Sequence, residues 1–124
     1  MKRILLAIML IVSVASFAQK ESPEAKLKAM NIELITPTKP MANYVKAVRT
    51  GKLIFLAGHG PTRADGTNVT GKVGGDLTVE QGVEAARITT ISLLSTLKAE
   101  LGDLGKIKRI VKVNGWVNCG PDFI

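Results

Sequence analysis

Between residues 44 and 57 the order of hydrophobic and polar positions predicts a β-hairpin. Residues 44–48 alternate, with Val45 and Ala47 opposite Tyr44, Lys46 and Val48, as expected for a strand with two unlike faces. Residues 52–57 are apolar at almost every position, which is typical of a strand buried on both faces. The intervening residues 49–51 form a short turn in which Gly51 can adopt a positive φ angle.

The longest periodic segment begins at Thr78 and predicts an amphipathic helix. Thr78 can cap this helix, and Gln81 stands where the reciprocal partner of a capping box belongs. Apolar positions then recur at steps of three or four and define one helical face, formed by Val83, Ala86, Thr90, Leu93, Leu97 and Leu101. Gly102 ends the helix. From Lys106 onward residues alternate again and predict a long strand, with Val111, Val113, Gly115 and Val117 on one face.

These elements predict an α+β fold built from one β-β-α-β unit. The helix would lay its apolar face on a sheet formed by the hairpin and the later strand. Three strands leave sheet edges and one sheet face uncovered. We therefore expect further strands, a partner chain or both to complete the sheet.

The first 42 residues divide into two segments ahead of a domain over residues 43–124. Residues 1–18 have a positive start, an apolar run and small residues at its end, a pattern that predicts a secretory signal peptide cleaved after Ala18. The alternative is an N-terminal membrane anchor, but the apolar run is shorter than the ~20 residues that a spanning helix needs. In residues 19–42, Ser22 and Pro23 predict the start of a short helix that ends near Asn31, followed by a proline-containing connector. We expect a periplasmic or secreted protein without a stable membrane anchor.

Composition excludes several classes of function. The chain has a net charge of +7, with 17 Lys and Arg against 10 Asp and Glu. Its densest basic stretch comprises Lys106, Lys108, Arg109 and Lys112. A nucleic-acid surface would combine such a cluster with stacking aromatic residues, which are scarce here, so we interpret the stretch as a solvated face and nucleic acid as an improbable partner. The lone Cys119 excludes an internal disulfide, and the single His59 argues against a histidine zinc site or a Ser-His-Asp triad.

Five segments together resemble the RidA/YjgF family of reactive enamine and imine deaminases, formerly described as L-PSP endoribonucleases. They are Asn43-Tyr44-Val45, Leu53 to Gly58 followed by Pro61, residues 70–78 (TGKVGGDLT), Leu101-Gly102-Asp103-Leu104, and residues 111–123. The resemblance implies a chorismate-mutase-like α+β fold and a homotrimer with ligand clefts between subunits. It also implies hydrolysis of enamines and imines such as 2-aminoacrylate to a keto acid and ammonia, without a metal or an organic cofactor.

The resemblance assigns substrate-binding roles to three residues and a catalytic role to none. Tyr44 matches a tyrosine that lines the cleft, and the alternative is a strand residue with its ring packed. Gly58 matches the glycine of a turn whose backbone approaches the ligand carboxylate, and the alternative is a simple turn former. His59 stands where glutamine is common, either as an exposed loop residue or as a proton carrier in the cleft. Ala57 replaces a common serine, so that a hydroxyl contact is lost.

The resemblance also identifies what is missing. The family's carboxylate-binding arginine, a cleft asparagine and a late glutamate all follow the position that matches Phe123, and no arginine of this chain matches the first of them. Cys119 precedes the family's cleft cysteine and does not correspond to it. Residues 120–124 form a turn that leads towards apolar residues instead of a polar tail, which predicts a fragment of a longer reading frame. We expect deaminase activity in the complete protein and an inactive fragment; the alternatives are a non-catalytic trimeric binder of small molecules and, more weakly, an RNA-acting protein.

Overall fold

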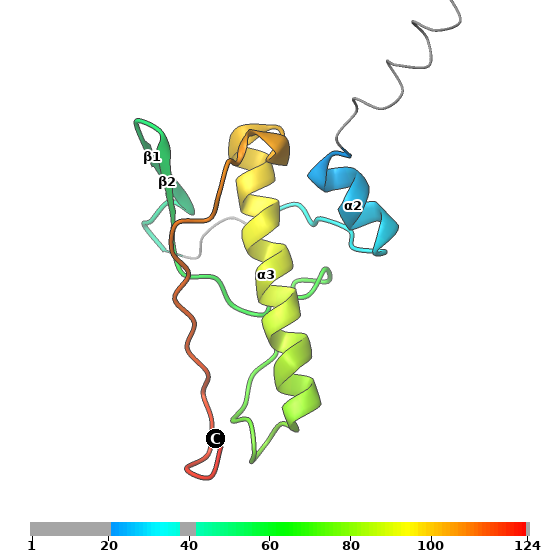
Figure 1. Ribbon diagram of the computed structural model, residues 1–124. Helices are drawn as coiled ribbons and strands as arrows, with labels where there is room; N and C mark the ends of the chain where they lie inside the picture. The colour runs from blue at the N-terminus through cyan, green and yellow to red at the C-terminus, as the bar shows by residue number, and fades with distance from the viewer. Residues whose placement is uncertain (1–20, 38–41, 124) are drawn as a thin grey trace, which may run out of the picture.

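The computed structural model describes residues 21–37 and 42–123 and shows an α+β fold (Figure 1). In chain order its elements are α2 (Pro23–Ala29), β1 (Ala47–Thr50), β2 (Leu53–Leu56), α3 (Val79–Leu101) and the 3-10 helix η1 (Leu104–Lys106). The predicted signal peptide and its cleavage site lie outside the described residues. Among the helices that the structure describes, none combines the length and the apolar character needed to cross a membrane.

Helix α3 begins and ends where the sequence predicts. The Thr78 hydroxyl accepts a hydrogen bond from the Gln81 N–H at 3.2 Å, and the Gln81 side chain accepts one from the Thr78 N–H at 2.8 Å. This reciprocal pair is the predicted capping box. At the other end Gly102 adopts a left-handed conformation with φ 75°, which closes the helix because glycine has no Cβ to oppose it.

Replacing Gly102 with alanine is expected to lower the free energy of unfolding by about 1 kcal/mol, because an L side chain is disfavoured at this positive φ angle. Gly75→Ala is the matched control. Gly75 has no positive φ angle, and an added Cβ would meet its nearest neighbours at ordinary contact distances of 3.7 and 3.8 Å. Urea unfolding of both variants measures the difference, and an unchanged midpoint for Gly102→Ala would contradict the expectation.

The predicted hairpin is confirmed, but the predicted burial of its second strand on both faces is wrong. Strands β1 and β2 pair antiparallel from Ala47 opposite Leu56 to Thr50 opposite Leu53, and Gly51 in the turn has φ 55°. Strand β2 lies within the predicted residues 52–57, but β1 is displaced along the chain from the predicted residues 44–48. Residues 44–46 lie outside β1, and Arg49 and Thr50, which were predicted in the turn, form its end. The apolar β2 was expected to be buried on both faces, yet Leu53 and Phe55 are 47% and 57% exposed. The sheet has only two strands, so no layer among the described residues covers its outer face.

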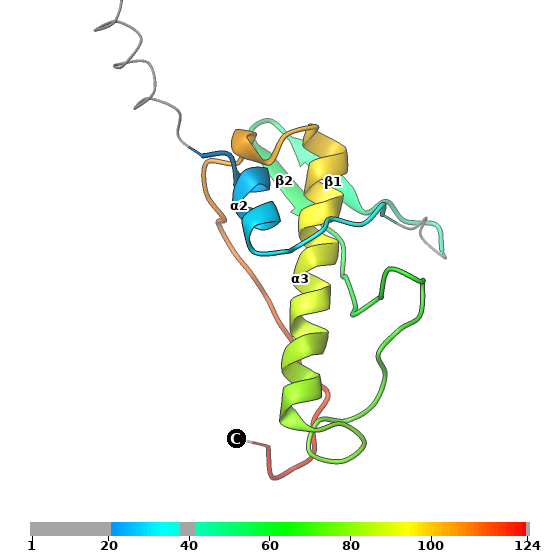
Figure 2. The same cartoon turned by 90° about the vertical axis from the view of Figure 1, so that its right-hand side faces the viewer.

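The predicted third strand is extended but belongs to no sheet. Residues 107–118 run beside α3 from its C-terminal end towards its N-terminal end (Figure 2). They are mostly exposed, and Trp116 reaches 87%. Pairing begins only beyond this segment, where Cys119 forms an isolated bridge with Val73. Alternation correctly predicted an extended chain, but strand pairing also needs a neighbouring strand, which the described residues do not provide.

The predicted apolar face of α3 is only partly the buried one. Leu93, Leu97 and Leu101 are half-buried, whereas Val83 is 66% exposed. The most buried residues of the helix are polar: Ser92, Ser95 and Thr96. Two of these hydroxyls, those of Ser95 and Thr96, are hydrogen-bonded to connecting segments that pack on this part of α3. The Ser95 hydroxyl accepts one such bond from the Ile35 N–H at 3.1 Å.

Val73 joins the loop over residues 71–77 to residues 118–120 near the N-terminal end of α3. Its side chain is buried, with 5% of the residue exposed. The Val73 N–H donates to the Asn118 carbonyl, and the Val73 carbonyl accepts from the Gly120 N–H, both at 2.9 Å. The first turn of α3 approaches the same side chain at Gly82. This close approach restricts the position of the first turn of α3 relative to the loop over residues 71–77.

Helix α2 has the predicted cap and is fastened to the far end of α3. The Ser22 hydroxyl accepts from the Ala25 N–H at 3.1 Å, and the helix ends at Ala29, close to the predicted Asn31. One oxygen of Glu24 accepts from Lys98 Nζ at 2.7 Å and from the Leu104 N–H at 2.8 Å. The hydrogen bond from Lys98, followed by that from Leu104, lowers the pKa of the Glu24 carboxyl from 4.5 to about 2.

Acid is expected to weaken the attachment of α2. Because the folded pKa of Glu24 lies below its unfolded value, the carboxylate stabilises the fold above pH 4.5, and this contribution is lost as the pH falls towards 2. A Glu24→Gln variant should therefore be less stable than the wild type near neutral pH, and the gap should close towards pH 2. Urea unfolding across this range measures the gap. A difference that does not change with pH would contradict the role of the carboxylate charge.

Candidate ligand loop at the open end of the hairpin

The three residues that the sequence nominates lie at the same end of the hairpin. Beyond the last strand pair, the Ala57 N–H donates to the Lys46 carbonyl at 3.0 Å. Tyr44 comes just before this point in the chain, and Gly58 and His59 follow it. Tyr44 is 49% exposed, and no hydrogen bond joins it to Gly58 or His59 in the part of the chain that the structure describes. The fold thus places all three residues beyond the same end of the hairpin.

His59 is half-buried, and both nitrogens of its ring are occupied. Nδ1 lies 2.8 Å from the Ala57 carbonyl oxygen, and Nε2 lies 2.8 Å from the Thr96 hydroxyl. A carbonyl oxygen can only accept, so we assign the ring proton to Nδ1, and in the neutral ring the Thr96 hydroxyl donates to Nε2. The interpretation of His59 as an exposed loop residue is therefore wrong. Neither nitrogen is free to carry a proton to a ligand while these bonds last.

Nothing in the described chain requires glycine at position 58. Its φ angle is not positive, and an added Cβ would have no heavy atom within 4 Å. Its backbone N–H donates no hydrogen bond to any residue that the structure describes. An exposed glycine with an unused donor is the backbone arrangement that a carboxylate can approach closely.

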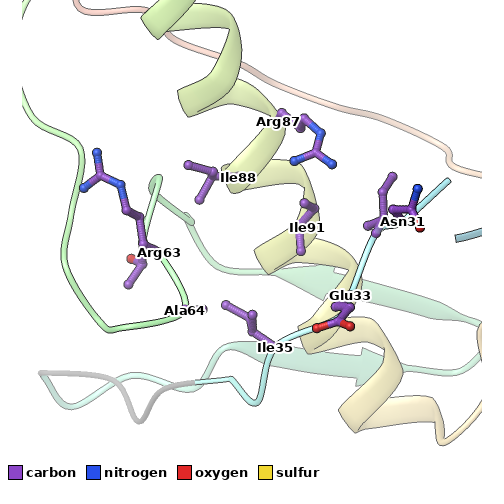
Figure 3. Close-up of a pocket in the computed structure, with 10 residues that line it drawn as sticks. Asn31, Glu33, Ile35, Arg63, Ala64, Arg87, Ile88 and Ile91 are labelled. Atoms are coloured by element: carbon purple, nitrogen blue, oxygen red, sulfur yellow. The ribbon is translucent and has the colours of Figure 1, made fainter. Parts of the chain in front are cut away.

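A separate hollow lies where the connector after α2 and the loop before α3 cross the helix (Figure 3). It has a volume of about 220 Å³, and Ile35, Ile88 and Ile91 supply apolar parts of its lining. Arg63 and Arg87 also line it, but each already has a partner, Thr67 at 3.3 Å and Glu84 at 3.4 Å respectively. None of the three nominated residues contributes to it. Sequence patterns do not predict this hollow, because its walls come from segments far apart in the chain.

The hydropathy pattern did not identify Ser95 and Thr96, two buried residues of α3 that hold connecting segments. Their exposed fractions are 2% and 4%, and each bonds a segment from another part of the chain. Adjacent Ser and Thr in the middle of a long helix were the available signal, since hydroxyl residues are neutral to unfavourable there unless their side chains find a partner.

Metal-binding groups are not gathered in this region. Within residues 21–37 and 42–123, no three His, Cys, Asp or Glu side chains lie close enough together to hold a metal ion. Cys119 is a free, half-buried thiol near the chain end.

Comparison with known proteins defines the class of fold. No family model matches the chain. A solved structure from Shewanella oneidensis MR-1, named as a candidate endoribonuclease, is 31% identical with a TM-score of 0.68, over 72% of this chain and 59% of that one. This structural similarity shows that the α+β chain has a RidA-like fold.

Two further proteins share this similarity. The protein Atu1372 of Agrobacterium tumefaciens, of unknown function, is 36% identical with a TM-score of 0.70, over 82% of this chain and 60% of that one. Protein TCP17 of Trypanosoma cruzi is 38% identical over 99 residues, which are 80% of this chain and 62% of the relative. The chain therefore spans about three fifths of the length of the proteins that it matches.

Proposed function

We propose that the full-length protein hydrolyses reactive enamines and imines such as 2-aminoacrylate to a keto acid and ammonia. The observation that carries the proposal is the loop after β2, in which Gly58 is exposed. Among the described residues, nothing requires glycine at this position and no group accepts a hydrogen bond from its N–H. The RidA-like fold and the family resemblance of the flanking segments support it. Tyr44, at the same end of the hairpin, would line the ligand site.

The proposed reaction needs little beyond positioning. An enamine first takes a proton at carbon and gives up a proton from nitrogen, which yields the imine. Water then adds across the C=N bond to give a tetrahedral carbinolamine. Its hydroxyl proton passes to the nitrogen, and ammonia leaves as the C–N bond breaks and the C=O bond forms. The protein must hold the substrate carboxylate and order the water. The Gly58 N–H can donate to the carboxylate, but no arginine of this chain matches the family's carboxylate-binding position, so these 124 residues alone are expected to be inactive.

The same proposal includes a homotrimer with ligand clefts between subunits, in a periplasmic or secreted location. Support for assembly comes from apolar surface that the described chain leaves uncovered. Val83 on α3 is 66% exposed, and Val113 and Trp116 on the extended segment are 75% and 87% exposed. Surface of this kind in a chain without internal disulfides favours burial against other chains.

Turnover by the full-length protein is the direct test. Decay of 2-iminopropanoate should be accelerated over buffer, with pyruvate and ammonia formed in equal amounts. RNA, suggested by the name of the Shewanella protein and by the exposed basic residues of the extended segment, should not be cleaved. Imine decay at the buffer rate, or strongly salt-dependent binding and cleavage of RNA, would contradict the proposal.

A non-catalytic binder of small carboxylates is the second candidate, and the His59 geometry favours it. Both ring nitrogens are engaged, and Ala57 removes a hydroxyl that many members of the resembling family carry. A binding site would then remain without a group to move protons. Saturable binding of pyruvate without imine turnover would select this function over the deaminase.

A further inference from the structure

We infer that the hydrogen bond between His59 and Thr96 is a latch that holds the Gly58 N–H in the orientation required for ligand binding. His59 is then a positioning residue, and the inference rests on the proposed function of the loop. The latch consists of the His59 ring, the Ala57 carbonyl and the Thr96 hydroxyl, with both contacts at 2.8 Å. It joins residues that are 37 positions apart in the chain.

The bond from Nδ1 to Ala57 closes a small ring around Gly58. It spans residues 57 and 59, so it restrains the two peptide units on either side of the glycine. Without such a restraint, a glycine samples a wider range of backbone angles than any other residue. The local bond therefore limits where the Gly58 N–H can point.

The bond from Nε2 to Thr96 ties this local arrangement to the helix. Thr96 is 4% exposed and belongs to the 23-residue helix α3, which gives the loop a rigid support. No other hydrogen bond joins residues 58–60 to α3 in the described parts of the chain. Because Gly60 also lacks neighbours around its Cβ position, packing offers little substitute for the latch.

Ser95 shows that this part of α3 is built to hold connecting segments. Its hydroxyl donates to the Ile91 carbonyl at 2.7 Å and accepts from the Ile35 N–H at 3.1 Å. Thus two adjacent buried hydroxyls fasten two different segments to one turn of the helix. The Thr96 hydroxyl differs because its partner, His59, adjoins the Gly58 N–H, which donates to no acceptor in the part of the chain that the structure describes.

Thr96→Val in the full-length protein tests the latch, because valine keeps the shape of threonine and removes the hydroxyl. Thr96→Ser, which retains the hydroxyl, is the matched control. We expect Thr96→Val to raise the dissociation constant for pyruvate and the KM for 2-iminopropanoate about tenfold, as for the loss of one buried hydrogen bond. The kcat should change less, and Thr96→Ser should stay near wild type.

Two measurements made without ligand test the latch independently of the proposed function. The ring ¹⁵N resonances of His59 should show the proton on Nδ1 in the wild type, and amide exchange at Gly58 should accelerate in Thr96→Val but not in Thr96→Ser. Unchanged exchange and unchanged pyruvate affinity in Thr96→Val would overturn the latch. A wild type that shows the expected ring and exchange behaviour but binds no pyruvate would overturn the proposed function, and with it the positioning role, while leaving the hydrogen-bonded contact itself established.

Discussion

Replacing Gly58 with valine is expected to lower kcat/KM of the full-length protein for 2-iminopropanoate about a hundredfold, with little loss of stability. The fold does not need glycine here, because the φ angle is not positive and the space around the missing Cβ is empty. Under the proposed function that space belongs to the ligand. A branched side chain would displace the substrate carboxylate from the Gly58 N–H, and a displacement of about 1 Å can cost about a hundredfold in rate.

Ala64→Val is the matched control for the Gly58 variant. It adds apolar bulk on a neighbouring exposed loop that lines the hollow near Arg63 instead of the open end of the hairpin. Steady-state kinetics and urea unfolding of both variants separate activity from stability. If Ala64→Val lost turnover and Gly58→Val kept it, the ligand site would lie in that hollow and not at the loop after β2.

Replacing Gly82 with alanine is expected to destabilise the protein by up to about 2 kcal/mol, although alanine is the better helix former. A Cβ at this position would lie 2.8 Å from Val73 Cγ2 and 3.3 Å from Cγ1. The valine cannot easily move, because its side chain is stiff at χ1 and its backbone is bonded to Asn118 and Gly120. The cost of such overpacking, typically 1–3 kcal/mol, outweighs the gain of about 1 kcal/mol in helix propensity.

A double-mutant cycle makes the Gly82 prediction specific. Val73→Ala removes the obstructing methyl groups at the cost of a cavity, and in that background Gly82→Ala should be neutral or stabilising. Urea unfolding of the wild type, both single variants and the double variant gives the interaction free energy. If Gly82→Ala stabilised the protein in the wild-type background, the added Cβ would not clash with Val73, and the prediction would be wrong.

Features that depend on local sequence were predicted well. The capping box of Thr78 and Gln81, the glycine that ends α3 at Gly102, and the Ser22 cap are all confirmed. Each is a contact between residues at most a few positions apart, so the amino acids themselves specify it. The hairpin is confirmed for the same reason, since its turn brings neighbouring strands together.

Features that depend on distant partners were predicted poorly. Alternation over residues 107–118 indicated a strand, but a ladder requires a neighbour that the described residues do not supply. The helical periodicity of α3 located an apolar face, yet the deepest positions include Ser95 and Thr96, whose partners lie 60 and 37 residues away. A hydropathy pattern alone would place these two hydroxyl-bearing residues at the surface. Only the backbone donors and the imidazole that reach them in three dimensions explain their burial.

The candidate site was predicted in part. The sequence nominated Tyr44, Gly58 and His59 through a family resemblance, and their binding roles remain predictions. The fold adds that all three lie at one end of the hairpin and that the Gly58 N–H has no acceptor within residues 21–37 and 42–123. For His59 it replaces an exposed side chain with one bonded through both nitrogens. The Thr96 hydroxyl that explains this geometry has no signature in a short motif.

Titration of the full-length protein with pyruvate, followed through the backbone amide resonance of Gly58, tests whether this N–H binds the ligand carboxylate. We expect a saturable shift of the Gly58 amide as its N–H donates to the carboxylate, with the amide of Gly66, in the loop beyond, unaffected. Saturable binding of pyruvate that leaves the Gly58 resonance unmoved would contradict the assignment of this loop as the ligand site.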